Sequence, residues 1–156
     1  VTSLAFGCFL GLEDWRTDSF CPALPLSYLE KKWWQSKYSV SFPRIRPFEG
    51  SFEPNSIVSD ADLLQLICAY RIFNEEVEIA LSTRERPAFR DNLVQLGVTS
   101  MSAGSRTEPG GYTEKNKELE QFAISDDRNP DDFTQMIRSK GYEVVWKDWD
   151  ECLHAI

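Results

Sequence analysis

The sequence alternates between short apolar segments and helical patterns, and this alternation constrains the fold more than any other feature. We expect strands at 1–10, 38–42, 77–81, 98–102 and, at the end, 142–146, and helices at 17–37, 60–73, 87–96 and 130–140. Such alternation favours an α/β fold with a parallel sheet and right-handed crossovers. A closed (β/α) barrel needs about 250 residues, so 156 residues would supply about half of one. A small doubly wound sheet is the alternative topology.

The packing faces of the expected elements follow from their apolar spacing. In helix 60–73, Leu63, Leu66, Ile67 and Tyr70 share one face, and Ser59 is a suitable N-cap. In helix 17–37, the apolar residues at helical spacing are Leu24, Tyr28, Leu29 and Trp33, and we expect this face to pack on the sheet. The segment 1–10 is apolar throughout, which predicts a strand that is buried on both faces.

Composition excludes several classes of function. The net charge of −8 disfavours binding to nucleic acid or to an anionic membrane. No apolar run approaches the roughly 20 residues of a membrane span. The four cysteines show no CxxC spacing, so we expect free thiols in a reducing, cytoplasmic protein. Because the sequence opens directly in an expected strand, we also expect it to continue a longer chain.

Polar or glycine-rich residues follow every expected strand of the main sheet. In both topologies ligands bind at the carboxyl ends of parallel strands, so these segments should lie together. They are 11–14, 43–47, 82–85 and 102–105. The coincidence at four strand ends predicts a binding site there, although each segment alone is a weak signal.

Arginines are the most informative side chains of these segments. The guanidinium of Arg84 offers a planar fork of donors that matches a carboxylate, and it would fix the acid end of an amino-acid substrate. The alternative is an ion pair with Glu85 or Glu108. Arg44 and Arg46 point the same way on an extended segment. They would clamp an anion or pair with nearby acidic residues, namely Glu49 and Glu53.

Small residues mark two further positions. Ser102 and Ser105 flank Ala–Gly, which allows a ligand to approach the backbone closely or forms an ordinary turn. Gly7 and Gly11 frame a segment against which a flat adenine would pack, and tight helix–strand packing explains them equally well. His154 and Cys152 alone make no zinc site, and no phosphate-binding glycine motif is present.

The motifs at the strand ends resemble one enzyme family. The segments that carry the resemblance are GLEDWRTD (11–18), YSVSFPRIRP (38–47), LSTRE (81–85), FRD (89–91), MSAGS (101–105), PGGY (109–112), LEQF (119–122) and VWKDWD (145–150). Together they resemble the radical S-adenosylmethionine (SAM) tyrosine lyases of thiamine biosynthesis, in order along nearly the whole chain. The resemblance implies the second half of a radical-SAM (β/α) barrel with a carboxy-terminal associated region.

The resemblance also implies an activity. Members of this family use SAM and a [4Fe-4S] cluster to break the Cα–Cβ bond of tyrosine. The products are 2-iminoacetate (dehydroglycine) and p-cresol, and the imine feeds the thiazole synthase ThiG. The CxxxCxxC motif that holds the cluster in this family is absent from the sequence, so no metal ligand is expected here and these residues alone should be inactive.

Roles for individual residues follow from the resemblance as well. Gly7, Phe9, Gly11 and Asp14 resemble the GxIxGxxE motif that lies against the adenine of SAM, with Phe and Asp in place of Ile and Glu. Arg84 matches the arginine that holds the amino-acid carboxylate, and Ser102 matches a serine of the same pocket. Arg46 is expected to contact SAM or substrate.

The implied organisation is a barrel half at 1–105 and an associated region at 106–156 that packs on it. The nearest alternative is the related tyrosine lyase of hydrogenase maturation, whose carboxy-terminal extension carries a second cluster motif that this sequence lacks. An alternative of another class is a binding module that has lost catalysis.

Overall fold

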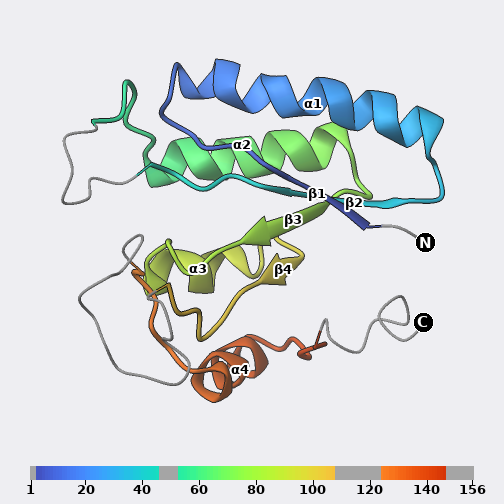
Figure 1. Ribbon diagram of the computed structural model, residues 1–156. Helices are drawn as coiled ribbons and strands as arrows, with labels where there is room; N and C mark the ends of the chain where they lie inside the picture. Colours follow the sequence, from blue (N-terminus) through green and yellow to red (C-terminus); the bar gives the residue numbers. More distant parts are fainter. Residues whose placement is uncertain (1–2, 46–52, 108–123, 147–156) are drawn as a thin grey trace.

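The computed structural model describes residues 3–45, 53–107 and 124–146, which form four parallel strands and four helices. In chain order these are β1 (Ser3–Gly7), α1 (Trp15–Lys32), β2 (Lys37–Ser41), α2 (Asp60–Phe73), β3 (Glu78–Leu81), α3 (Pro87–Leu93), β4 (Ser100–Met101) and α4 (Pro130–Ser139), as Figure 1 shows. The sheet order is β1-β2-β3-β4, with every pair parallel. A doubly wound sheet would reverse this order at a switch point, so the strictly sequential order confirms part of an α/β barrel.

Capping residues fix where the helices begin. Ser59 caps α2 through a complete capping box with Asp62, so this helix has the predicted bounds. Asp14 caps α1 by accepting a hydrogen bond from the Arg16 amide, which starts the helix earlier than predicted. The helix continues through Pro22 and Pro25 and ends at Lys32.

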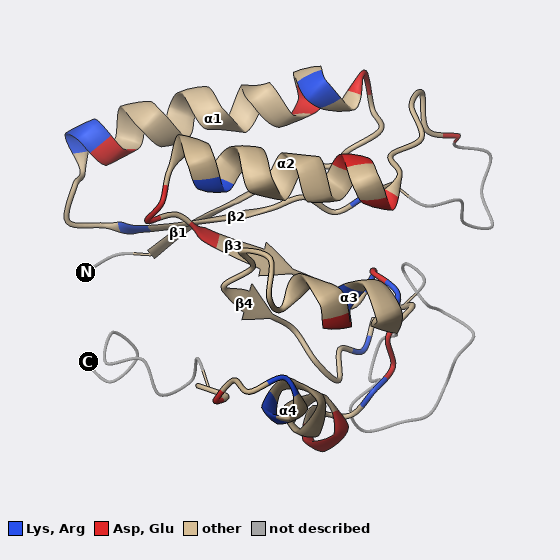
Figure 2. Ribbon diagram, turned by 180° about the vertical axis from the view of Figure 1, so that it is seen from behind, with Lys and Arg blue, Asp and Glu red and all other residues tan. Residues whose placement is uncertain are grey.

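The helices α1, α2 and α3 pack against the same face of the sheet and form one apolar core. Strand residues Phe6, Val40 and Ile79 face this core, together with Leu26 of α1 and Leu93 of α3. The predicted face of α2 is confirmed, since Leu63, Leu66, Ile67 and Tyr70 are all buried. The strands carry few charged residues. Figure 2 shows that most of the charged residues of the described chain lie at helix ends and in loops.

The predicted packing face of α1 is wrong in part. Leu24, Tyr28 and Trp33 are more than half exposed, whereas Leu26 is fully buried and Leu29 is partly buried against the core. The orientation of α1 about its axis, which differs from the predicted one, has a structural cause. The Tyr70 hydroxyl donates a hydrogen bond to the Ser19 carbonyl at 2.5 Å, and this brings the Ser19 side of α1 against α2. Apolar spacing alone did not identify which of the two stripes faces inward.

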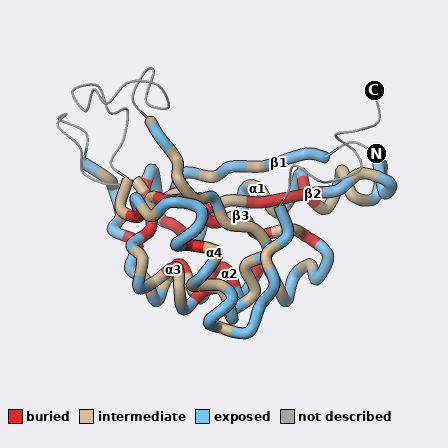
Figure 3. The backbone as a smooth tube through the Cα atoms, turned by 90° about the horizontal axis from the view of Figure 1, so that it is seen from below, coloured by how far each residue is buried: buried red, intermediate tan, exposed pale blue. Residues whose placement is uncertain are grey.

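The strand β1 is not buried on both faces as predicted. Four of its five residues are exposed, and Phe6 is partly buried. Figure 3 shows β1 mostly in the colour of exposed residues. Within the described ranges its sheet neighbour is β2 alone, so β1 lies at an edge of the sheet. An apolar run therefore predicted the strand correctly but not its surroundings.

The carboxy-terminal elements differ from expectation in one respect. No strand forms at Tyr142–Trp146, where the described backbone is irregular. Gly141 follows α4 with a φ of 84°, which ends the helix as a C′ glycine does. The helix α4 buries Phe133.

Candidate functional site

A hollow of about 200 Å³ opens at the carboxyl ends of β1, β2 and β3. Its lining residues are Phe9, Ser41, Phe42, Pro43, Ala80, Leu81, Ser82, Arg84 and Glu85. Two of the four polar segments that the sequence placed at strand ends, 43–47 and 82–85, thus contribute lining residues, whereas 11–14 and 102–105 contribute none. This is the site that the fold class predicts.

A row of small residues crosses the sheet next to this hollow. Gly7 is level with Ser41, Ser41 with Ala80, and Ala80 with Ser100. A β-carbon placed on Gly7 would lie 3.5 Å from the Ser41 hydroxyl, which is ordinary van der Waals contact, so a methyl group there would meet the Ser41 side chain. Barrel interiors are usually filled by bulky branched side chains, and a row without them leaves room for a ligand.

Arg84 borders the hollow and lies across it from β1. Its guanidinium carbon is 5.4 Å from the centre of the Phe9 ring, within the range of a cation–π contact. The side chain is half-buried, whereas its neighbours Thr83 and Glu85 are each only 2% exposed. Both flanks of Arg84 are therefore fixed in the fold.

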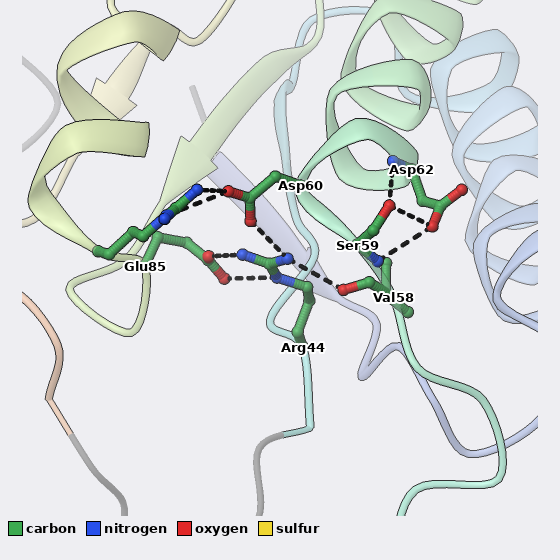
Figure 4. A network of polar contacts seen from close by, with 7 residues as sticks. Arg44, Val58, Ser59, Asp60, Asp62 and Glu85 are labelled. Atoms are coloured by element: carbon green, nitrogen blue, oxygen red, sulfur yellow. Dashed lines mark hydrogen bonds and ion pairs between the residues drawn. The ribbon is translucent and has the colours of Figure 1, made fainter.

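Glu85 is fixed by a buried ion-pair network rather than by Arg84 (Figure 4). Arg44 donates to both carboxylate oxygens of Glu85, and its Nε–Oε1 distance is 3.1 Å. Its remaining nitrogen donates to the Val58 carbonyl at 3.0 Å and lies 2.9 Å from the Asp60 carboxylate. This fork pairing joins the ends of β2 and β3 to the start of α2. Arg44 thus pairs with Glu85 and Asp60. The sequence had suggested Glu49 or Glu53 as partners, and of these Glu49 lies outside the described residues.

The charges of this network keep their ionised forms. Burial disfavours the charged Arg44, yet hydrogen bonds to Glu85 and Asp60 outweigh it and raise the pKa of the guanidinium. Burial likewise opposes ionisation of Asp60, but hydrogen bonds from Arg86 and Arg44 lower the pKa of its carboxyl. The network is therefore a permanent structural connection at neutral pH.

A second buried network lies behind the ends of β3 and β4. Arg90 of α3 is fully buried and pairs with the carboxylate of Asp126, which is 1% exposed. Arg90 also donates to the Ser102 carbonyl and lies over the Phe133 ring, 4.4 Å from its centre. Arg128 donates to the same carboxylate, with a 2.8 Å bond from Nε to Oδ1. Burial raises the pKa of Asp126, but Arg128 and Arg90 more than offset this, and the pKa is lowered.

Ser102 lies at the tip of β4 beside the hollow. Its amide donates to the Leu81 carbonyl at 3.1 Å, so it directly neighbours the lining strand β3. Its side chain is exposed and is not among the residues that border the cavity. The structure thus places Ser102 next to the site that contains Arg84 and Phe9.

The remaining predicted residues have different surroundings. Gly11 is buried with a φ of 108°, and its carbonyl accepts from the Asn55 amide at 2.8 Å, so it mediates a tight backbone crossing. Asp14 is exposed and caps α1. Arg46 lies outside the described residues. The structure therefore brings Phe9 and Arg84 to one cavity and places Gly7 beside its lining residue Ser41, whereas Asp14 does not line it.

Sequence reasoning missed the buried acids. Asp126 lies close in sequence to Asp127, Asp131 and Asp132, but Asp126 is buried between two arginines while the other three are exposed. No local pattern distinguishes the four, because the partners of Asp126 include Arg90, which is 36 positions away.

No metal centre forms among the described residues: no group of three or more histidine, cysteine, aspartate or glutamate side chains is placed to hold an ion.

The Cys8 thiol donates to the Asp18 carbonyl at 2.8 Å, and burial together with the nearby Asp18 raises its pKa to about 11. In the part of the chain that is described, no helix is long and apolar enough to cross a membrane.

Comparison with known proteins places these observations in a family. Residues 41–143 match the Biotin and Thiamin Synthesis associated domain. The chain is 46% identical over 154 residues to 2-iminoacetate synthase from Escherichia coli (strain K12). The matched region covers 98% of this chain and 41% of the relative. The corresponding protein of Salmonella typhimurium (strain LT2) is 44% identical with the same coverage. The chain thus spans about two fifths of the length of these curated relatives.

Solved structures show the same likeness. An X-ray structure of the FeFe-hydrogenase maturase HydG from Carboxydothermus hydrogenoformans has a TM-score of 0.79 at 33% identity, covering 91% of this chain and 32% of that protein. A second crystal structure of HydG, a maturase of the [FeFe]-hydrogenase, has a TM-score of 0.80 at 31% identity, covering 90% and 31%.

Parallel strands that alternate with helices, with polar tips gathered at one hollow, define a segment of an α/β barrel protein. The chain belongs to the Biotin and Thiamin Synthesis associated domain family. Along essentially its whole length it is homologous to 2-iminoacetate synthase, ThiH, and more distantly to HydG.

Proposed function

We propose that the chain is the carboxy-terminal part of a radical SAM tyrosine lyase that converts tyrosine to 2-iminoacetate and p-cresol for thiazole synthesis. The identity of 46% to 2-iminoacetate synthase supports this reaction over that of HydG, whose structures are 31% and 33% identical. In this proposal 2-iminoacetate passes to the thiazole synthase ThiG. Residues 1–105 form the barrel half, and residues 106–156 pack on it.

The observation that carries the proposal is the position of Arg84 at the hollow. A half-buried guanidinium at the tip of a parallel strand binds a carboxylate through two parallel hydrogen bonds. Anchoring the tyrosine carboxylate there holds the amino group at a fixed distance from a reactive group in the same cavity, which is how positioning lowers a barrier. Ser102, at the neighbouring tip, would contact the same end of the substrate.

The small row on the sheet would face SAM. Gly7 and its neighbours Ser41 and Ala80 leave space for a flat group, and the Phe9 ring lies at the mouth of that space. We propose that Gly7 and Phe9 bind the adenine side of SAM, that Gly11 supports them through the backbone, and that Arg46 contributes from outside the described residues. Asp14 is assigned the capping of α1 instead.

The described residues do not fit the cluster, since they offer no set of thiolate ligands. In the proposed complete enzyme, residues outside this chain would hold the cluster, and the cluster together with SAM would supply the radical chemistry. The part played by this chain is to bind the substrate, to orient it and to exclude water. A dry, enclosed site prevents a reactive species from being quenched by solvent.

The proposal is tested by replacing Arg84 with lysine in the complete enzyme. Lysine keeps the charge but lacks the planar fork, so the KM for tyrosine should rise at least tenfold while SAM binding is unchanged. Arg86→Lys is the matched control, because Arg86 lies two positions further on and its side chain is largely exposed. An Arg84→Lys enzyme that binds tyrosine as tightly as the Arg86→Lys enzyme would contradict the assigned role.

The substrate class is tested separately from the residue. The complete gene should restore growth without thiamine to a strain that lacks 2-iminoacetate synthase, and the purified enzyme should release p-cresol from tyrosine. Failure of complementation together with p-cresol release would favour the HydG-like reaction, which the structural likeness leaves as the second candidate.

A further inference from the structure

The two residues that would contact the substrate lie on strand-end loops that one short segment holds from behind. This segment, residues 124–128, precedes α4 and lies far from both loops in sequence. It contacts the loop of Arg84 through its backbone. It is joined to the backbone of Ser102 indirectly, because the Asp126 side chain pairs with Arg90, which donates to the Ser102 carbonyl.

The first contact fixes the peptide group of Arg84. The Thr83 carbonyl accepts hydrogen bonds from the amides of Ser125, at 3.0 Å, and Asp126, at 3.1 Å. This carbonyl and the Arg84 amide belong to the same peptide unit, whose plane is rigid. Two donors to this carbonyl therefore restrain the orientation of that plane, and with it the backbone from which the Arg84 side chain extends.

The second contact fixes the backbone of Ser102. The Ser102 carbonyl accepts a hydrogen bond from one terminal nitrogen of Arg90, and the other terminal nitrogen pairs with the Asp126 carboxylate. Arg90 is 0% exposed, and its Nε makes no hydrogen bond with the described residues. A fully buried guanidinium needs its counter-ion, because an unpaired buried charge is strongly destabilising.

We infer that Asp126 is a positioning residue of the lyase, which sets the substrate contacts of both Arg84 and Ser102. This inference rests on the proposed function of those two residues. The amide of Asp126 orients the Arg84 peptide, and its carboxylate keeps Arg90 in place to hold Ser102. Removing the negative charge leaves Arg90 without its counter-ion, so Arg90 moves toward water and both loops shift.

The inference makes a kinetic prediction that a purely structural role does not. Displacement of a positioning group by about 1 Å can cost about a hundredfold in rate. Asp126→Asn retains the shape of the side chain but loses the charge, and it should raise the KM for tyrosine by about tenfold or more while the affinity for SAM changes less than about threefold. Asp127→Asn is the matched control, because Asp127 is the exposed neighbour and lies in neither network.

A milder variant separates positioning from folding. Arg90→Lys keeps a positive charge opposite Asp126, but an ammonium group cannot donate to Asp126 and Ser102 from opposite ends of a fork. It should therefore raise the KM for tyrosine even if Asp126→Asn does not fold. Equal tyrosine KM values for Arg90→Lys and the unmodified enzyme would overturn the inference.

The decisive measurement is a double-mutant cycle in the complete, cluster-loaded enzyme. If Asp126 acts through Arg84, the Asp126→Asn substitution should raise the tyrosine KM much less in an Arg84→Lys background than in the unmodified enzyme. Multiplicative effects, or an Asp126→Asn enzyme indistinguishable from Asp127→Asn, would overturn the inference while a strong Arg84→Lys effect still supports the proposed function. A silent Arg84→Lys substitution would instead reject the proposed function itself.

Discussion

Gly11 and Gly7 belong to one proposed SAM motif, but the structure gives them different physical reasons for being glycine. Gly11 has a φ of 108°, and a β-carbon there would lie 2.9 Å from the Ser56 carbonyl oxygen and 3.2 Å from Pro54. Gly7 has no such strain, and its added β-carbon would meet only the Ser41 hydroxyl at 3.5 Å. Gly11→Ala should therefore lower the stability of the fold, whereas Gly7→Ala should leave the stability nearly unchanged and weaken ligand binding.

The size of the Gly11→Ala effect follows from these contacts. A positive φ costs a residue with a β-carbon about 1–2 kcal/mol, and a forced close contact adds about 1–3 kcal/mol. The reduced entropy of the unfolded chain returns about 0.4–1 kcal/mol. We therefore expect a loss of about 2–4 kcal/mol in the free energy of unfolding. Gly7→Ala should change the free energy of unfolding by less than about 1 kcal/mol, because alanine is better tolerated than glycine in a strand.

The assay is urea unfolding of both variants beside the unmodified protein, followed by circular dichroism and compared by midpoint and slope. With slopes of about 1–3 kcal/mol per molar urea, Gly11→Ala should lower the midpoint by roughly 1 M or more. A titration with SAM completes the comparison, because the methyl of Gly7→Ala enters the space next to Ser41 and should weaken binding without unfolding the protein. A Gly11→Ala protein as stable as Gly7→Ala would refute the reasoning.

Two further predictions concern the helix α1 and the thiol beside it. Leu26→Ala should lower the free energy of unfolding by about 2–5 kcal/mol, since the side chain is fully buried. Leu24→Ala should change it by less than about 0.5 kcal/mol, because Leu24 is 59% exposed. Equal losses in chemical denaturation would mean that α1 presents a different face to the core. At pH 8, Cys8 should react with iodoacetamide about two orders of magnitude more slowly than the exposed Cys21 and Cys68, because a pKa of about 11 leaves little thiolate. The reaction rate of Cys8 should keep rising toward pH 11. Mass-spectrometric mapping that finds Cys8 labelled first would contradict this prediction.

The sequence was sufficient for the elements whose signals are local. The Ser59 capping box and the apolar face of α2 lie within a few residues of each other, and both were predicted correctly. The polar segments at all four strand ends were predicted to meet because parallel strands place their carboxyl ends on one edge, and two of them, 43–47 and 82–85, line the hollow. Arg84 was chosen on that argument together with the family resemblance, and it does border the hollow.

The failures concern contacts between distant segments. Leu24 and Leu26 are both apolar, and only the packing of Tyr70 against Ser19 decides which side of α1 is buried. Asp14 is a good helix cap as well as a plausible motif residue, and the structure shows the capping role. The pairing of Arg44 with Glu85 spans 41 positions, so nearer acids such as Glu49 and Glu53 were equally reasonable partners beforehand.

The exposed edge of β1 has a practical consequence for anyone who produces these residues by themselves. Backbone amides and carbonyls on the side of β1 away from β2 form a ready template for a foreign strand, and edges of this kind promote aggregation. Recombinant material is therefore expected to stay monomeric only when another segment, fused or added in trans, occupies that edge. Purification strategy thus depends on a five-residue strand as much as on the binding cavity.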